Sequence, residues 1–165
     1  MIVVDTNIIS TFARVSALEH VKTLLEVECL FINPAAFGEL HRAREAGCDF
    51  IENILELIRE RTFLDIVELT RAEILATQEL PRSLGAGEAE SIAVCLMRKG
   101  TKLLTNDKSA RNFCREKSIP CLDLPAILRA LWLRQVLAKQ EVRNLLQQIE
   151  AEEGIVIKNS DRIFE

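Results

Sequence analysis

Short apolar runs alternate with longer segments of helical periodicity along the chain, and this alternation is the strongest constraint on its fold. Runs rich in Ile, Val, Leu and Phe predict strands at residues 2–4, 29–32, 63–69, 102–105 and 119–122. Strands separated by helices form βαβ units, whose right-handed crossovers make the strands parallel and place helices over the sheet. The chain therefore predicts a single α/β domain with a central, mostly parallel sheet flanked by helices on both faces.

The segments between these runs have the periodicity and the end signals of helices. Asn33 followed by Pro34 is typical of a helix start, Gly47 of a helix end, and Thr70 of another helix cap. Segment 88–98 is apolar nearly all round, which indicates a buried helix. We expect helices at residues 7–14, 17–26, 34–46, 49–60, 71–80, 88–98, 108–117, 125–137 and 139–153, and the apolar tail 154–158 is compatible with an added strand.

Composition favours a globular protein with reduced cysteines. Its 165 residues fit one domain, and a hydrophobic share of 48% is enough for a sizeable core. No segment resembles a signal peptide, and no apolar run approaches the ~20 residues of a membrane-spanning helix. The five cysteines are odd in number, form no C-x-x-C pair and mostly have apolar neighbours, as expected in a cytoplasmic protein. With only two histidines beside them, a zinc site is disfavoured.

The net charge of −4 argues against a nucleic-acid partner, because phosphates are normally bound by basic surfaces. Two features weaken this objection. Carboxylates that hold divalent cations are neutralised when loaded, and basic residues crowd one stretch, namely Arg98, Lys99, Lys102, Lys108, Arg111, Arg115 and Lys117. Solvated helix faces explain such a charge run equally well, so both interpretations stay open.

Four acidic residues stand where parallel sheets build their sites, at the carboxyl ends of the strands. Asp5 and Asp107 directly follow predicted strands, and Glu88 opens the helix that leads into the second of these strands. Glu39 lies about two turns into the helix after residues 29–32. Uncompensated carboxylates repel one another unless a cation lies among them, and ligands that are all oxygen select Mg²⁺ or Mn²⁺. The four acids together predict such a metal site.

Each acid also has a purely structural interpretation. Asp5 and Asp107 are good N-caps for the helices that follow them. Glu88 is placed to complement a helix dipole, and Glu39 to pair with Arg42 one turn later.

Four stretches, in order, resemble the PIN-domain nucleases. They are the opening run that ends in Asp5-Thr6-Asn7, the helical Glu39, Gly87-Glu88-Ala89-Glu90-Ser91-Ile92-Ala93, and Leu103-Leu104-Thr105-Asn106-Asp107. The resemblance implies an acidic pocket that binds Mg²⁺ or Mn²⁺ and hydrolyses RNA phosphodiester bonds. It divides the chain into a PIN-like nuclease domain at residues 1–125 and a C-terminal helical extension at 126–165, packed on the same domain.

The third motif offers two acids, in a Gly-Glu-x-Glu form that resembles a prokaryotic PIN subgroup. Glu88 and Glu90 are two residues apart on a helix and point in nearly opposite directions, so they cannot serve one ion equally. We favour Glu88, because Ile92 then matches the family's Asp-x-x-x-Ile-Ala pattern, and Glu90 becomes a supporting or first-turn helix acid. Thr105 and Asn7 are expected to orient the metal ligands or the substrate phosphate.

The sequence also departs from the family. Many relatives carry a further acid just after the last motif, where this chain has Ser109 and Ala110, which weakens a second metal site. We expect a cytoplasmic metal-dependent endoribonuclease, and small relatives imply a toxin held by an antitoxin-like protein. The alternative is a catalytically weak or silent PIN-fold module that binds RNA or a protein. An aspartyl phosphatase would require a second Asp where Asn7 stands.

The last helix carries an apolar stripe of Val142, Leu145, Leu146 and Ile149. This stripe either packs on the chain's own sheet or stays exposed as a homodimer interface or antitoxin-binding groove. We expect a homodimer, and we expect truncation after about Leu124 to spare the metal ligands while changing association.

Overall fold

The computed structural model describes residues 1–158 and 160–165. Its five strands form one parallel sheet in the order β3-β2-β1-β4-β5. They are β1 (Ile2–Val4), β2 (Leu30–Ile32), β3 (Leu64–Ile66), β4 (Lys102–Leu104) and β5 (Cys121–Leu122). The chain adds β2 and β3 on one side of β1 and then returns to add β4 and β5 on the other. Strand order therefore reverses between β1 and β4.

The predicted strands and helices are confirmed, with shifts at their ends. The helices are α1 (Thr6–Arg14), α2 (Leu18–Leu25), α3 (Pro34–Glu45), α4 (Ile51–Glu60), α5 (Arg71–Thr77), α6 (Ala86–Met97), α7 (Lys108–Glu116), α8 (Leu124–Leu133) and α9 (Lys139–Glu153), followed by the 3-10 turn η1 (Ser160–Ile163). No described helix is long and apolar enough to cross a membrane.

The added strand at 154–158 is absent from the described part of the tail, so that expectation is wrong. The backbone N–H of Ile155 donates to the Glu150 carbonyl at 3.1 Å. The N–H of Ile157 donates to the Glu150 carboxylate at 2.7 Å. These bonds tie the tail to the end of α9, so it does not pair with the sheet.

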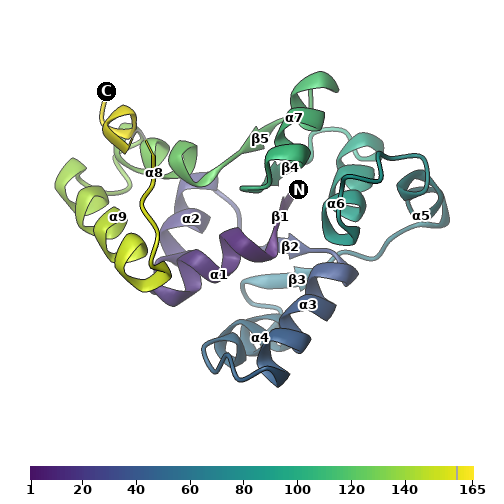
Figure 1. The fold of residues 1–165 in the computed structure, drawn as a ribbon, viewed down its shortest axis with the longest axis horizontal. Helices are drawn as coiled ribbons and strands as arrows, with labels where there is room; N and C mark the ends of the chain where they lie inside the picture. Colours follow the sequence, from purple (N-terminus) through teal and green to yellow (C-terminus); the bar gives the residue numbers. More distant parts are fainter. Residues whose placement is uncertain (159) are drawn as a thin grey trace.

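Alternation along the strands divides the core between the two faces of the sheet. Ile2 and Val4 of β1 pack in one buried cluster with residues of α1, α2, α3, α4, α8 and α9. Val3 points to the other face, where it joins a second cluster with residues of α6 and α7. Helices therefore cover both faces, as predicted; Figure 1 shows α8 and α9 beside α1 and α2, and α5 beside α6 at the opposite end.

The stripe on α9 is not an exposed interface. All four of its residues are buried in the same cluster as β1 and α1, at 0% to 7% exposure. At the end of α8, Trp132 Nε1 donates to the Ile163 carbonyl at 2.6 Å. Because α8 and α9 complete this core, truncation after Leu124 would expose apolar residues of α1 and α2. Of the two alternatives for the stripe on α9, the structure therefore has the one in which it packs on the chain's own core.

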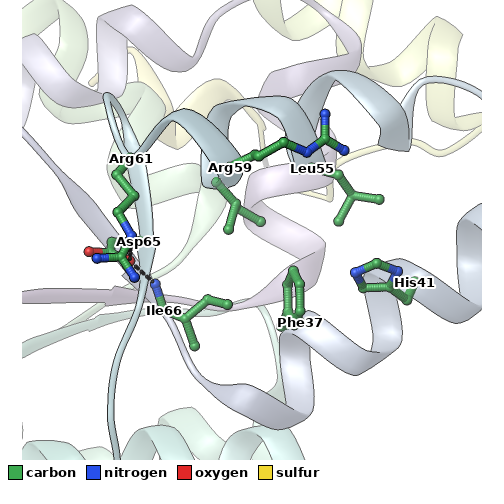
Figure 2. Close-up of a pocket in the computed structure, with 8 residues that line it drawn as sticks. Phe37, His41, Leu55, Arg59, Arg61, Asp65 and Ile66 are labelled. Atoms are coloured by element: carbon green, nitrogen blue, oxygen red, sulfur yellow. Dashed lines mark hydrogen bonds and ion pairs between the residues drawn. The ribbon is translucent and has the colours of Figure 1, made fainter.

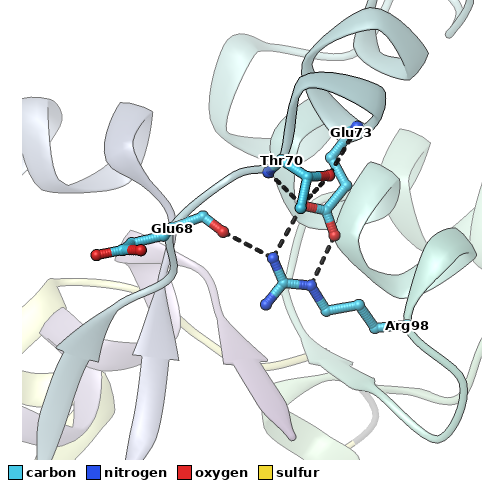
Figure 3. A network of polar contacts seen from close by, with 4 residues as sticks. All are labelled: Glu68, Thr70, Glu73 and Arg98. Atoms are coloured by element: carbon cyan, nitrogen blue, oxygen red, sulfur yellow. Dashed lines mark hydrogen bonds and ion pairs between the residues drawn. The ribbon is translucent and has the colours of Figure 1, made fainter.

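A buried ion pair joins α5 to the end of α6 (Figure 3). Arg98 Nε donates to Glu73 Oε1 at 2.6 Å, and its Nη2 donates to Glu73 Oε2 at 2.8 Å and to the Glu68 carbonyl at 2.7 Å. Glu73 also closes a capping box with Thr70 at the start of α5. The hydrogen bonds from Arg98 are the main reason that the pKa of Glu73 is lowered to about 2; burial opposes this shift, and the hydrogen bonds from Thr70 add to it.

Glu73→Gln is expected to lower the free energy of unfolding near neutral pH by about 2 kcal/mol. Because the pKa of Glu73 is lower in the folded than in the unfolded state, its carboxylate stabilises the folded protein at pH values above the unfolded pKa. This stabilisation is lost as the pH falls through about 2. Urea titrations at several pH values should therefore show a flatter acid dependence for Glu73→Gln than for the unsubstituted protein. Glu68→Gln is the matched control, because Glu68 contacts Arg98 only through its carbonyl; equal losses in both variants would contradict the assignment.

Candidate active site

The reversal of strand order places Asp5 beside the end of β4. The backbone N–H of Asp5 donates to the Leu104 carbonyl at 2.9 Å. Thr105 Oγ1 donates to Asp5 Oδ2 at 2.9 Å and accepts the N–H of Asp107 at 3.0 Å. Thr105, which is 1% exposed, thus links the two acids that follow β1 and β4.

Asp107 is the N-cap of α7. Its Oδ1 accepts the N–H of Ala110 at 2.6 Å. The structural interpretation of Asp107 is therefore realised, but the cap uses only one of its two carboxylate oxygens. The other oxygen makes no hydrogen bond with the described residues.

Glu39 reaches the same edge from α3. Thr6 Oγ1, in the first turn of α1, donates to Glu39 Oε2 at 2.8 Å. A Cβ atom on Gly87 would lie 3.6 Å from Glu39 Oε1, so the first turn of α6 passes directly beside this carboxylate. Among the ion pairs of the described residues there is none between Glu39 and Arg42, so that structural interpretation of Glu39 is not realised. Thr6 is a partner that the sequence analysis missed, although its place after Asp5 is the signal that could have found it.

The two acids of the third motif have different tasks. Glu90 Oε2 accepts the N–H of Ala35 at 2.9 Å, so Glu90 completes the start of α3. The carboxylate of Glu88 instead folds back over Gly85, in the space that a Cβ at that position would occupy. Glu88 makes no hydrogen bond with the described residues and acts electrostatically on Asp5.

Asn33 and Ser91 hold α3 and α6 together behind these acids. Asn33, which is 1% exposed, caps α3 by accepting the N–H of Ala36 at 2.8 Å. Its amide nitrogen donates to the Gly87 carbonyl at 2.8 Å and to Ser91 Oγ at 2.7 Å. The sequence marks Asn33 as a cap, but its link to α6 depends on the fold.

Burial and neighbouring acids act together on Asp5. Burial is the main reason that the pKa of Asp5 is raised to about 6; the hydrogen bond from Thr105 opposes it, and Glu88 and then Glu39 raise it further. Within residues 1–158 and 160–165, no ion pair neutralises Asp5, Glu39, Glu88 or Asp107. Three of the acids therefore interact as like charges with no basic partner.

The donor chemistry of these acids fits a hard divalent cation, but their side chains are not gathered into a closed coordination sphere. No group of three or more His, Cys, Asp or Glu in the described chain is arranged to hold an ion. Glu39 and Asp107 each use one carboxylate oxygen in a side-chain hydrogen bond with the described residues, and Asp5 accepts from Thr105. Mg²⁺ and Mn²⁺ are the ions that prefer such oxygens.

Asn7 lies outside this cluster. It is exposed and lines a polar hollow of about 360 Å³ with Ser10, Thr11, Arg14, Asn106, Glu153 and Ile155. A second hollow, also about 360 Å³, is lined by residues of α3, α4 and β3 and by none of the four acids (Figure 2). There Phe37 and His41 pack edge to face at 4.5 Å opposite Leu55 of α4, away from the four acids.

A further strand-end acid, Asp123, follows β5 and was missed by the sequence analysis. It caps α8 through the N–H of Ala126 at 3.0 Å and forms an ion pair with Arg111. Both its oxygens are occupied, so it does not replace the acid missing at Ser109 and Ala110.

Comparison with known proteins agrees with this arrangement. A family model described as PIN domain matches residues 1–161, nearly the whole chain. Searches of curated proteins and of solved structures found no significant match. The match extends beyond residue 125, consistent with the packing of α8 and α9 into the main core. The chain therefore belongs to the PIN-domain family.

Proposed function

We propose that the protein is an endoribonuclease that hydrolyses RNA phosphodiester bonds with Mg²⁺ or Mn²⁺ held by Asp5, Glu39, Glu88 and Asp107. The observation that carries this proposal is the raised pKa of Asp5, a half-buried carboxyl beside two further acids with no basic partner. Such an arrangement is unfavourable in the unliganded protein and becomes favourable when a cation is bound. PIN domains are typically nucleases, which agrees with this chemistry.

The residues of the chain have separable tasks in this proposal. Asp5 and Asp107 are held by Thr105 at the point where strand order reverses, and Glu39 is held by Thr6. Glu88, in the first turn of α6, acts electrostatically on Asp5, while the Glu90 carboxylate accepts a backbone N–H at the start of α3. A bound divalent ion would activate a water molecule and polarise the scissile phosphate. Asn7 lies farther along α1, where its amide is available to substrate rather than to the acids.

The biological setting follows from the same proposal. The five cysteines are all free, which suits a reducing cytoplasm. We infer that the protein acts there on RNA, as the toxin of a toxin–antitoxin pair, with an antitoxin-like protein and a second copy of the chain as partners. The competing function is a PIN-fold module that binds RNA or protein without cleaving it, which the open arrangement of the acids favours.

Asp5→Asn is expected to abolish Mg²⁺-dependent cleavage of a single-stranded RNA while stabilising the metal-free protein by about 1–3 kcal/mol above pH 6. The folded state raises the pKa of Asp5 above its unfolded value, so the charged Asp5 side chain destabilises the folded protein. This destabilisation is complete above about pH 6 and shrinks as the pH falls toward 4. RNA cleavage assays and urea titrations at pH 7.5 and pH 4.5 measure both effects. Asp49→Asn, at an exposed position, is the matched control; full activity in Asp5→Asn would overturn the proposed site.

Glu88→Gln is expected to weaken Mn²⁺ binding by about tenfold or more, because it removes a charged oxygen ligand. Glu90→Gln should weaken it much less, because the Glu90 carboxylate accepts from a backbone N–H that a Gln oxygen also satisfies. Isothermal titration calorimetry of the two variants gives the comparison. Equal losses would show that both side chains reach the ion.

Metal affinity is expected to rise with pH and to level off above about 6. A proton on Asp5 competes with the cation, so affinity should fall by up to tenfold for each pH unit below that value. Mn²⁺ titrations between pH 5 and pH 8 measure this dependence. An affinity that does not change between pH 5 and pH 7 would remove Asp5 from the ligand set.

A further inference from the structure

The basic stretch that ends in Lys117 is divided by the fold into residues with internal partners and residues without them. Arg98 is held by Glu73 and the Glu68 carbonyl. On α7, Arg111 and Arg115 are four residues apart and share one side of the helix, whereas Phe113 and Lys117 share the opposite side. This stretch is therefore not uniformly solvated: Arg98 and Arg111 are paired with acids, whereas Arg115 and Lys117 are exposed.

Arg111 and Arg115 line a hollow of about 480 Å³ between α7, β5 and the start of α8. The rest of its lining consists of Ile119, Cys121, Asp123 and Ala126. Two guanidinium groups face one carboxylate here, so the hollow has a net positive charge although the chain as a whole is acidic. This local excess of positive charge fits an anion.

Arg111 is oriented before any ligand arrives. Its Nη1 is paired with Asp123, and the other oxygen of Asp123 is occupied by the cap of α8. Arg111 Nε is buried and has no hydrogen-bond acceptor among the described residues. A buried donor without an acceptor is costly, so the guanidinium has capacity for a further anionic oxygen. Arg115 is exposed and contacts only Asn112, on its own helix.

The hollow lies along α7, the helix that Asp107 caps. Asp107 caps α7, and Arg111 and Arg115 follow it by one and two turns on the same side, at about 6 and 12 Å along the helix axis. Asp123 ends β5, the strand next to β4. Each turn of α7 is close to the separation of neighbouring phosphates along an extended nucleic-acid strand. A strand with one phosphate at Asp107 can therefore place the next ones beside Arg111 and Arg115.

We propose that the hollow of Arg111 and Arg115 binds the phosphates of the RNA next to the scissile bond, so that the substrate leaves the acidic cluster along α7. The ligand is the ribose-phosphate backbone, which arginine binds through paired N–H donors without reading the base. This inference rests on the proposed ribonuclease function and names the side of the site along which the RNA runs.

The test compares Arg115→Gln with Lys117→Gln, which removes the same charge from the opposite side of the same helix. Binding of fluorescein-labelled decauridylate is followed by fluorescence anisotropy in Mg²⁺, with both substitutions placed in Asp5→Asn protein so that the RNA stays intact. Arg115→Gln should weaken binding about fivefold to tenfold and reduce the slope of log K against log salt by about 0.7, the value for one lost phosphate contact on a single strand. Lys117→Gln should change either quantity much less.

Arg115→Lys separates charge from geometry, because lysine keeps the charge but not the paired donors. It should restore the salt slope and only part of the affinity. Melting temperatures of all variants should agree within about 2 °C, because Arg115 is exposed and bonded only within α7.

The outcomes distinguish this inference from the function on which it rests. Equal losses in Arg115→Gln and Lys117→Gln would overturn the phosphate site, even if the unsubstituted protein cleaves RNA. A selective loss in Arg115→Gln without any metal-dependent cleavage would overturn the ribonuclease and support the site. A failure of the Asp5→Asn protein to bind decauridylate would overturn the site, and the cleavage assay on the unsubstituted protein would then decide the function independently.

Discussion

The pairing of β1 with β4 is the interaction on which the rest of the structure depends. Three residue pairs lie in register, Ile2 with Lys102, Val3 with Leu103 and Val4 with Leu104. The strands belong to opposite halves of the sheet, so their pairing creates the point where strand order reverses. The helices that follow β1 and β4 leave the sheet in different directions at this point, so they do not cover the carboxyl ends of the two strands. An uncovered polar edge beside a fully buried strand is what allows Asp5 to be half-buried and charged.

A second set of interactions holds α3, which carries Glu39, against α6, which carries Glu88. The Asn33 amide satisfies the start of α3 and bonds the first turns of α6, while Glu90 of α6 returns a hydrogen bond to the start of α3. This reciprocal arrangement fixes the approach of the two helices, with Gly87 at the point where they pass. Glu39 and Glu88 act electrostatically on Asp5, and the hydrogen bonds that hold their two helices together oppose the repulsion between the acids.

Much of this architecture could be predicted from the chain itself. Apolar runs and cap residues located the strands and helices to within a few positions, because burial and capping are local requirements of the backbone. The structure of residues 154–158 could not be predicted in the same way. Their apolar run is too short to distinguish a strand from a segment that is tied to α9. The apolar stripe on α9 was seen correctly, but periodicity alone does not say whether a stripe packs inside its own chain or on a partner. That choice depends on whether α1 and α2 leave a surface to cover.

For the candidate site, the sequence alone determined which acids stand at strand ends and helix starts, and the order in which they occur. The tertiary structure decided how each acid is held: Thr6 against Glu39, Thr105 between Asp5 and Asp107, and Glu90 turned toward Ala35. It also decided that Asp123 is neutralised by Arg111 while Asp5 has no basic partner in the described chain. The physical reason is that capping and apolar burial act over a few neighbouring residues. Charge pairing and desolvation instead depend on distances between residues far apart in the sequence, and only the closed sheet sets those distances.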